Sequence, residues 1–364
     1  MAHNPRIGIL NEVRAHWRLP VIVAERCVHS RMETASCRRC EVSCPKEAWV
    51  FDDEQIGIDM NACDGCGLCA AACPEQAIVS EAAPAVRVWD DAPVAFAACE
   101  FATDQKTGSG CISCLHAITM TDLVRLYRGG DSRLLFPHGD CEGCFHNTSL
   151  SLHSRYANLN ILLASHKLPG YSVVEVPPGH WEALLQRTSA DAPAGPAMGR
   201  RAFLRRGVAE AVDRGLEHIG MPDAQGLHDD SPATPPGLHM PRGRPHHMAF
   251  FVPAIDADRC EGCGACLSAC AHGAIRQEDD AYMLDADACS GCGACVDICT
   301  PRALSVRAWT PQQTARVRLK LESRSCRSCG VVFRLPAGRI ETGQLLCPVC
   351  HRANHQKNLF QVLD

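Results

Sequence analysis

The sequence predicts an α+β multidomain protein, in which two small cysteine-rich modules flank a small parallel α/β domain and a cysteine-paired segment follows. Three observations support this prediction. A motif with three closely spaced cysteines recurs, strand-like and helix-like segments alternate in the middle, and two further C-x2-C pairs stand near the end. The 364 residues are enough for about two to four domains.

The composition is dominated by its 25 cysteines. Such a count indicates either a disulfide scaffold in a secreted protein or metal ligands in a cytosolic one. The first twenty residues contain no apolar signal-peptide core, and the cysteines stand in tight C-x-x-C groups that could not cross-link distant segments. We therefore expect metal binding and a cytoplasmic location.

Charge and hydropathy exclude two classes of partner. The formal net charge of −5 gives no reason to expect nucleic-acid binding. No apolar run reaches the length of about 18 residues that a transmembrane helix needs. We expect protein partners and no transmembrane segment.

The recurring motif is C-x2-C-x2-C followed by a fourth cysteine. Segments that begin at Ala62, Arg259 and Ala288 align without gaps, and a segment that begins at Ser36 matches them in part. They form two pairs, which predict modules at residues 22–82 and 250–308. Three thiolates on one tight, glycine-containing loop suit a [4Fe–4S] cluster, whereas a structural zinc site does not need this spacing.

Both modules resemble bacterial two-cluster ferredoxins, in which the fourth cysteine of one repeat ligates the cluster of the other. This resemblance implies three well-matched ligand sets: Cys63, Cys66, Cys69 and Cys44; Cys260, Cys263, Cys266 and Cys299; and Cys289, Cys292, Cys295 and Cys270.

The remaining repeat departs from the pattern, because nine residues separate its first two cysteines. We expect its ligands to be Cys27, Cys37, Cys40 and Cys73, with a loop inserted after Cys27. The alternative is that Cys27 is not a ligand, which would leave a three-iron or labile site. With Cys27 included, the chain is expected to hold four [4Fe–4S] clusters.

The middle segment, residues 92–182, predicts a small parallel α/β domain. Val94–Cys99, Arg133–Phe136 and Tyr171–Val176 are typical of buried strands, and residues 116–130 and 151–166 are typical of helices. Open α/β sheets bind ligands at the carboxyl ends of their strands. Five further cysteines are expected to converge there: Cys99, Cys111, Cys114, Cys141 and Cys144.

On its C-x-x-C pair and its HGDCEGC turn, this domain resembles the small iron–sulfur subunits of hydrogenase–heterodisulfide reductase systems. The resemblance implies a [2Fe–2S] cluster that receives electrons from a flavoprotein or hydrogenase. A structural zinc ion and a redox-active dithiol are the alternatives. A cluster would leave the fifth thiol without a role.

The last two segments are predicted to be a linker and a metal-binding segment. Residues 187–249 are rich in Pro and Gly and predict a mostly flexible linker with one short helix. Residues 320–356 resemble a zinc ribbon, because two C-x2-C pairs stand 17 residues apart. One Zn²⁺ is expected there, with rubredoxin-type iron as the alternative, on Cys326, Cys329, Cys347 and Cys350.

Together these features predict a polyferredoxin that relays single electrons between partner redox proteins in a cytoplasmic oxidoreductase complex. The partners would be flavoprotein, hydrogenase or reductase subunits. We expect no catalytic activity of its own, because the sequence shows neither a dinucleotide fingerprint nor a nucleophile with its base. The alternatives are a maturation or scaffold factor for metalloenzymes and a redox sensor that acts through the middle thiols.

Overall fold

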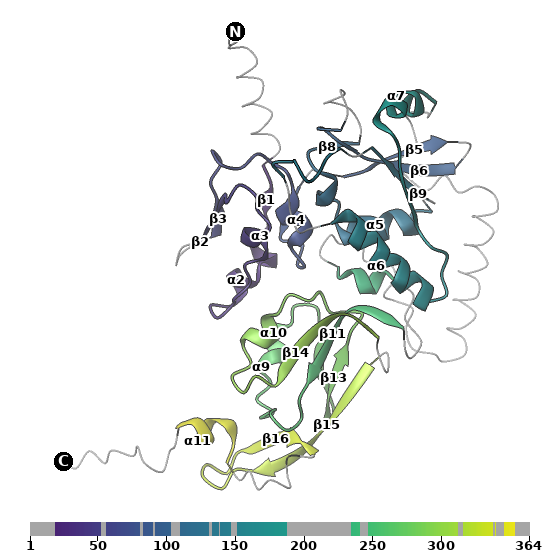
Figure 1. Cartoon of the computed structure of the whole chain (residues 1–364). Helices are drawn as coiled ribbons and strands as arrows, with labels where there is room; N and C mark the ends of the chain where they lie inside the picture. The colour runs from purple at the N-terminus through teal and green to yellow at the C-terminus, as the bar shows by residue number, and fades with distance from the viewer. Residues whose placement is uncertain are drawn as a thin grey trace. The chain divides into compact units, whose positions relative to one another are not determined.

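The computed structural model describes residues 19–51, 56–80, 83–89, 92–102, 110–130, 133–137, 139–146, 151–187, 234–240, 247–311, 316–337, 339 and 346–353. The chain forms two compact units (Figure 1). Unit 1 comprises Met1–Arg26 and Arg38–Met240, and unit 2 comprises Cys27–Cys37 and Pro241–Asp364. The short helix predicted within the linker lies outside the described residues. Within the described part of the chain, no helix has the length and apolarity needed to cross a bilayer.

The first cysteine-rich module of unit 1 consists of short elements around a small core. Two antiparallel ribbons pair β1 (Val21–Ile22) with β4 (Ile78–Val79) and β2 (Trp49–Phe51) with β3 (Ile56–Ile58). The other elements are η1 (Ala24–Arg26), α3 (Arg39–Val42) and α4 (Leu68–Ala72). Trp49 and Ile78 pack with Cys69 in the core, so a cysteine is itself part of the packed interior.

The middle of unit 1 is a four-stranded sheet in the order β10-β9-β6-β5. Of its three parallel strands, β9 and β10 lie within the segments that the sequence predicts as strands, whereas β6 overlaps the predicted strand only at residues 94–96. The helices α5 and α6, which connect these strands, lie within the predicted helices. The antiparallel edge strand β5 was not predicted. The bounds are β5 (Ala85–Trp89), β6 (Ala92–Phe96), α5 (Met120–Arg128), β9 (Arg133–Phe136), α6 (Leu152–Ser165), β10 (Ser172–Glu175) and α7 (Pro178–Arg187).

Local sequence explains where α5 begins. Thr119 and Asp122 form a capping box, in which the Thr119 hydroxyl accepts the Asp122 N–H at 3.0 Å and the Asp122 carboxylate accepts the Thr119 N–H at 2.8 Å. Leu123 and Val124 are fully buried, and α5 packs against α6 (Figure 1).

Short elements carry the chain past the end of the sheet. β7 (Ala98–Cys99) pairs in parallel with β8 (Cys111–Ile112), and η2 (Leu115–Ala117) follows. Within the predicted linker, η3 (Pro236–His239) packs against α5 and is largely buried. This part of the expected flexible connection is therefore ordered structure that belongs to unit 1.

Unit 2 joins the second module to the C-terminal segment through one sheet. β11 pairs with β14, and a second sheet has the order β12-β13-β15-β16. β13 belongs to the module, and β15 begins the hairpin whose turn carries Cys326 and Cys329, so the two segments share a continuous sheet. The bounds are α2 (Val28–Arg31), β11 (Met248–Ile255), α9 (Ala265–Ala269), β12 (Ile275–Glu278), β13 (Ala281–Asp285), α10 (Ala294–Asp297), β14 (Leu304–Pro311), β15 (Arg316–Ser325), β16 (Val332–Pro336) and α11 (Pro348–Ala353).

Candidate iron–sulfur and metal sites

In unit 1, one triplet of cysteines shares a cavity with the fourth cysteine of the neighbouring repeat. Cys44 lines the same cavity as Cys63, Cys66 and Cys69. The triplet loop turns through Gly65 and Gly67, whose φ angles of 72° and 79° are ones that glycine adopts without strain. Gly67 also caps α4. The loop thus brings together four sulfur donors, which is the donor set of a [4Fe–4S] cluster.

Unit 2 repeats this arrangement. Cys260, Cys263, Cys266 and Cys299 line one cavity. The pKa of Cys295 is raised to about 12 by burial and then by the neighbouring thiols of Cys289, Cys292 and Cys270. In both groups, the cysteine that comes from the other repeat lies beside the triplet.

All four repeats share a hydrogen bond that the sequence does not reveal. In each, the last cysteine accepts a backbone N–H from the residue four positions later. N–H groups that point at sulfur stabilise a thiolate and its metal complex. The N–S distances are 3.4 Å at Cys44 from Ala48, 3.3 Å at Cys73 from Ala77, and 3.2 Å both at Cys270 from Ala274 and at Cys299 from Ala303.

The ligand set predicted for the atypical repeat falls in two units. Cys40 and Cys73 pack at the core of the first module in unit 1. Cys27 and Cys37 belong to unit 2, where Cys27 precedes α2 and the Cys37 carbonyl lies 2.6 Å from His29 Nε2. This ligand set stays a prediction.

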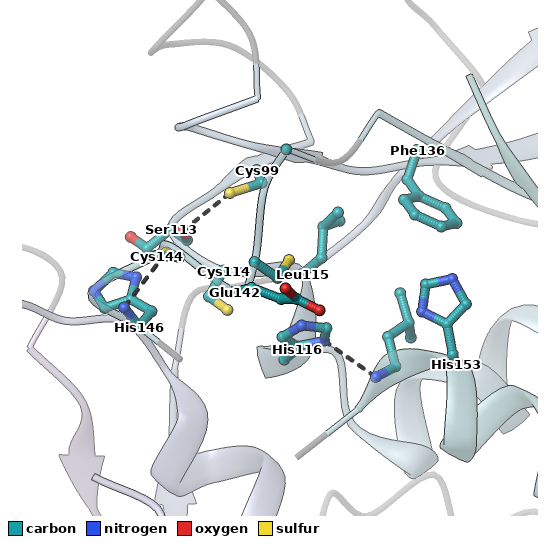
Figure 2. A pocket seen from close by; sticks show the side chains of 13 residues that line it. Cys99, Ser113, Cys114, Leu115, His116, Phe136, Glu142, Cys144, His146 and His153 are labelled. Carbon is teal, nitrogen blue, oxygen red and sulfur yellow. Dashed lines mark hydrogen bonds between the residues drawn. The ribbon is translucent and has the colours of Figure 1, made fainter. Parts of the chain in front are cut away.

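The middle domain gathers four of its five cysteines around one cavity of about 130 Å³. Figure 2 shows Cys99, Cys114 and Cys144 close together, with His146 on one side and His153 on the other. The fourth cysteine of this cavity, Cys141, is exposed. Cys111 lies at the start of β8 and is not among the residues that line the cavity.

The four C-terminal cysteines form a tighter group. Cys326, Cys329, Cys347 and Cys350 place their sulfur atoms within 4.8 Å of one another. The sulfur atoms of Cys329 and Cys347 are 3.8 Å apart, a spacing compatible with a single tetrahedral ion that has metal–sulfur bonds of about 2.3 Å. Backbone N–H groups of Cys329 and Cys347 lower the pKa of Cys326 to about 6, which favours its thiolate.

The distances between sulfur atoms distinguish the C-terminal cysteine site from the middle-domain site. Across the described residues, the C-terminal cysteines and the trio Asp64, Cys66 and His146 are the groups whose ligand atoms lie within 4.8 Å of one another. The middle cysteines are not among them. One zinc ion needs its ligands that close, whereas a cluster holds them apart because its iron and sulfide core lies between them.

Burial weakens the acidity of several thiols in the two ferredoxin-type modules and the middle domain. Burial, with a smaller contribution from neighbouring thiols, raises the pKa values of Cys69, Cys114 and Cys266 to about 12. Burial also raises the pKa of Cys66 well above its usual value. A buried thiol of this kind keeps its proton at neutral pH unless a metal ion replaces it, so metal loading releases protons.

Sequence reasoning did not find the polar residues between the two cysteine sites of unit 1. His146 Nε2 lies 2.8 Å from Asp64 Oδ2, and Lys46 Nζ lies 3.7 Å from the same oxygen. Burial alone would raise the pKa of Asp64, but the hydrogen bond and charge of His146, with the charge of Lys46, hold it below its usual value. His146 is 82 residues from Asp64, and although Asp64 stands within the Cys63–Cys69 motif, it occupies a position that the cysteine spacing leaves unspecified.

Comparison with known proteins places two [4Fe–4S] ferredoxin-type domains in the chain. The family described as 4Fe-4S dicluster domain matches residues 259–304, and the family described as 4Fe-4S binding domain matches residues 55–78. Ferredoxin-type protein NapF of Escherichia coli K12 is 36% identical over 70 residues, which are 18% of this chain and 42% of NapF. Pyruvate synthase subunit PorD of Thermotoga maritima is 35% identical over 65 residues, which are 17% of this chain and 59% of PorD.

The chain therefore spans less than half the length of NapF and about three fifths of PorD. The two family matches lie on the cysteine-rich modules, and together with the two relatives they confirm the prediction of an iron–sulfur, ferredoxin-type electron-transfer protein.

Proposed function

We propose that this chain is a polyferredoxin subunit that relays single electrons between partner redox proteins in a cytoplasmic oxidoreductase complex. The observation that carries this proposal is the grouping of each intact triplet in the two ferredoxin-type domains with the last cysteine of the neighbouring repeat. A bound [4Fe–4S] cluster supplies reversible one-electron chemistry. The protein supplies the four thiolates, the left-handed glycines and the N–H donors to sulfur. The partners that suit this chemistry are flavoprotein, hydrogenase or reductase subunits.

We propose four such clusters. Three sets follow the pattern of the intact triplets, and the fourth uses the cysteines of the atypical repeat. The crossed ligand proposed for this cluster, Cys73, accepts the backbone N–H of Ala77 at 3.3 Å, the same kind of hydrogen bond that the last cysteine of each other repeat accepts. The proposed ligands of the fourth cluster are Cys27, Cys37, Cys40 and Cys73.

We also propose a fifth centre in the middle domain, held by Cys99, Cys114, Cys141 and Cys144. The wide spacing of these thiols favours a cluster over one zinc ion. The matched variants Cys141→Ser and Cys111→Ser test the assignment. The first should lose the iron of this site, and the second, which changes a cysteine outside the cavity, should keep it. Equal iron loss in both would contradict this ligand set.

The C-terminal cysteines are proposed to bind one structural Zn²⁺, because the spacing of their sulfur atoms suits a single ion. Metal analysis distinguishes zinc from iron at this site. Rubredoxin-type iron would add a coloured centre that Cys347→Ser abolishes, whereas zinc would leave the visible spectrum of that variant unchanged.

Anaerobic redox titration tests the electron-transfer proposal. Visible absorbance should bleach stepwise on reduction, and EPR signals of reduced clusters should appear within the range of about −700 to +450 mV that such clusters span. Cys66→Ser and Cys266→Ser should each perturb a different signal. Protein that contains iron but does not bleach anywhere in this range would overturn the proposal.

A further inference from the structure

His146 joins the middle-domain cysteine site to a ferredoxin cysteine site within unit 1. Its backbone N–H donates to Cys144 Sγ at 3.4 Å, and its ring Nε2 lies 2.8 Å from Asp64 Oδ2. The other oxygen of Asp64 accepts the backbone N–H of Cys66 at 3.3 Å. A continuous polar connection therefore runs from the sulfur of one site to the ligand loop of the other.

A second, apolar contact runs beside this connection. Cys66 of the ferredoxin site and Cys114 of the middle site pack together with Leu68 in one buried cluster. Leu68 is fully buried and the two cysteines are less than 10% exposed. The two sites thus contact each other through side chains that exclude water.

The surroundings hold the His146 ring in place. The side chain is 2% exposed, and its ring packs against Phe101 and Phe145. Lys46 Nζ lies 4.7 Å from the centre of the Phe145 ring and also faces Asp64. The second ring nitrogen, Nδ1, is buried and has no protein hydrogen-bond partner among the described residues, while the ring lines the middle cavity.

From this geometry we infer that His146 and Asp64 couple the two cysteine sites into one electron-transfer pair. The inference depends on the proposal that both sites hold iron–sulfur clusters. A low-potential donor first reduces one of the two sites. One electron then passes from the reduced site to the oxidised site, and no bond is formed or broken. Tunnelling rates fall exponentially with distance, so two sites whose ligands pack into one buried cluster exchange electrons readily. Hydrogen bonds to cluster ligands also set the potential of each site.

Occupancy of the middle site must be established before the coupling is tested. Full-length protein is purified anaerobically, reduced in steps with dithionite, and examined by EPR. The Cys141→Ser variant identifies the signal of the middle site. If wild-type protein shows no signal that this variant removes, the proposed fifth centre fails, and the coupling inference fails with it.

The coupling is then measured in protein that shows the signal. We expect reduction of the site at Cys66 to split the middle-site signal or to speed its relaxation. In His146→Ala, electron equilibration between the two sites after flash reduction should slow by roughly tenfold or more. This is the lower end of the loss of activity seen when a hydrogen-bond partner of a metal ligand is removed. His153→Ala is the matched control, because His153 lines the same cavity from α6.

Two results would overturn the coupling while leaving the fifth centre intact. One is a middle-site signal that does not respond to reduction of the neighbouring site. The other is equal equilibration rates in His146→Ala and His153→Ala. Asp64→Asn guards against misfolding, because its amide oxygen can still accept the Cys66 N–H while its amide N–H donates to Nε2 of a neutral His146 in the other tautomer. It should keep the fast exchange and raise the potential of the ferredoxin site, since a negative charge beside that site is lost.

Discussion

Gly262 lies where the second ferredoxin-type domain meets the C-terminal hairpin, and its replacement by alanine tests how tightly these parts fit. Its φ angle is +65°, and an added Cβ would overlap the backbone carbonyl oxygen of Arg334 and lie 2.8 Å from its carbonyl carbon. Arg334 belongs to β16, which pairs with β15, and β15 in turn pairs with β13. The carbonyl is therefore held by a sheet and cannot move away alone.

The expected cost has two parts. A left-handed backbone costs a residue with a Cβ about 1–2 kcal/mol. Forcing an extra carbon into a packed site costs a further 1–3 kcal/mol or so, which gives about 2–5 kcal/mol for Gly262→Ala. Gly273 supplies the control, because its φ is +62° and a Cβ added there would meet no atom within 4 Å. Gly273→Ala should cost only the first part.

The assay is the urea concentration at which anaerobic protein loses its visible absorbance, together with iron content before unfolding. We expect Gly262→Ala to bleach at clearly lower urea than Gly273→Ala. The loop should also loosen from the hairpin, where Arg339 Nη1 donates to the carbonyl oxygens of Arg259 and Cys260 at 2.9 and 2.8 Å. Equal bleaching midpoints in the two variants would refute the reasoning that a packed carbonyl, and not backbone strain alone, fixes this glycine.

Three further predictions concern other parts of the chain. Cys27→Ser should lower iron content and alter the EPR spectrum, whereas an unchanged protein would show that Cys27 is not a ligand. Cys347→Ser should lose bound zinc while Cys111→Ser retains it, and zinc loss in both would point to misfolding instead of lost ligation. Thr119→Ala removes the capping box of α5 and should cost about 1 kcal/mol, seen as faster amide hydrogen exchange at the start of α5; unchanged exchange there would contradict the capping role.

Local sequence predicts the features that depend on local geometry. The glycines of the triplet loops are left-handed, as the spacing of their cysteines requires, for example at Gly65 and Gly291. The apolar runs of the middle segment correspond to the parallel strands β6, β9 and β10. In each case a few neighbouring residues determine the backbone, so the pattern can be read from the sequence.

Features that depend on contacts between distant segments could not be predicted in this way. His146 and Asp64 are 82 residues apart, and neither stands in a pattern that indicates the other. The pairing of β13 with β15 joins two segments that the sequence presents as separate domains. The edge strand β5 (Ala85–Trp89) precedes the predicted domain and carries no signal of its antiparallel pairing. Such contacts follow from packing, which residue spacing does not encode.

The buried cysteines connect metal loading to folding. Cys69 lies in the core of the first module, Cys266 and Cys295 in the core of the second, and Cys326 in the core of the C-terminal hairpin. Burial raises the pKa values of the first three, so without metal each adds a neutral thiol to its core. Metal binding replaces those protons with bonds that span the core. The clusters should therefore contribute directly to the stability of these small cores, which have few other large side chains to bury.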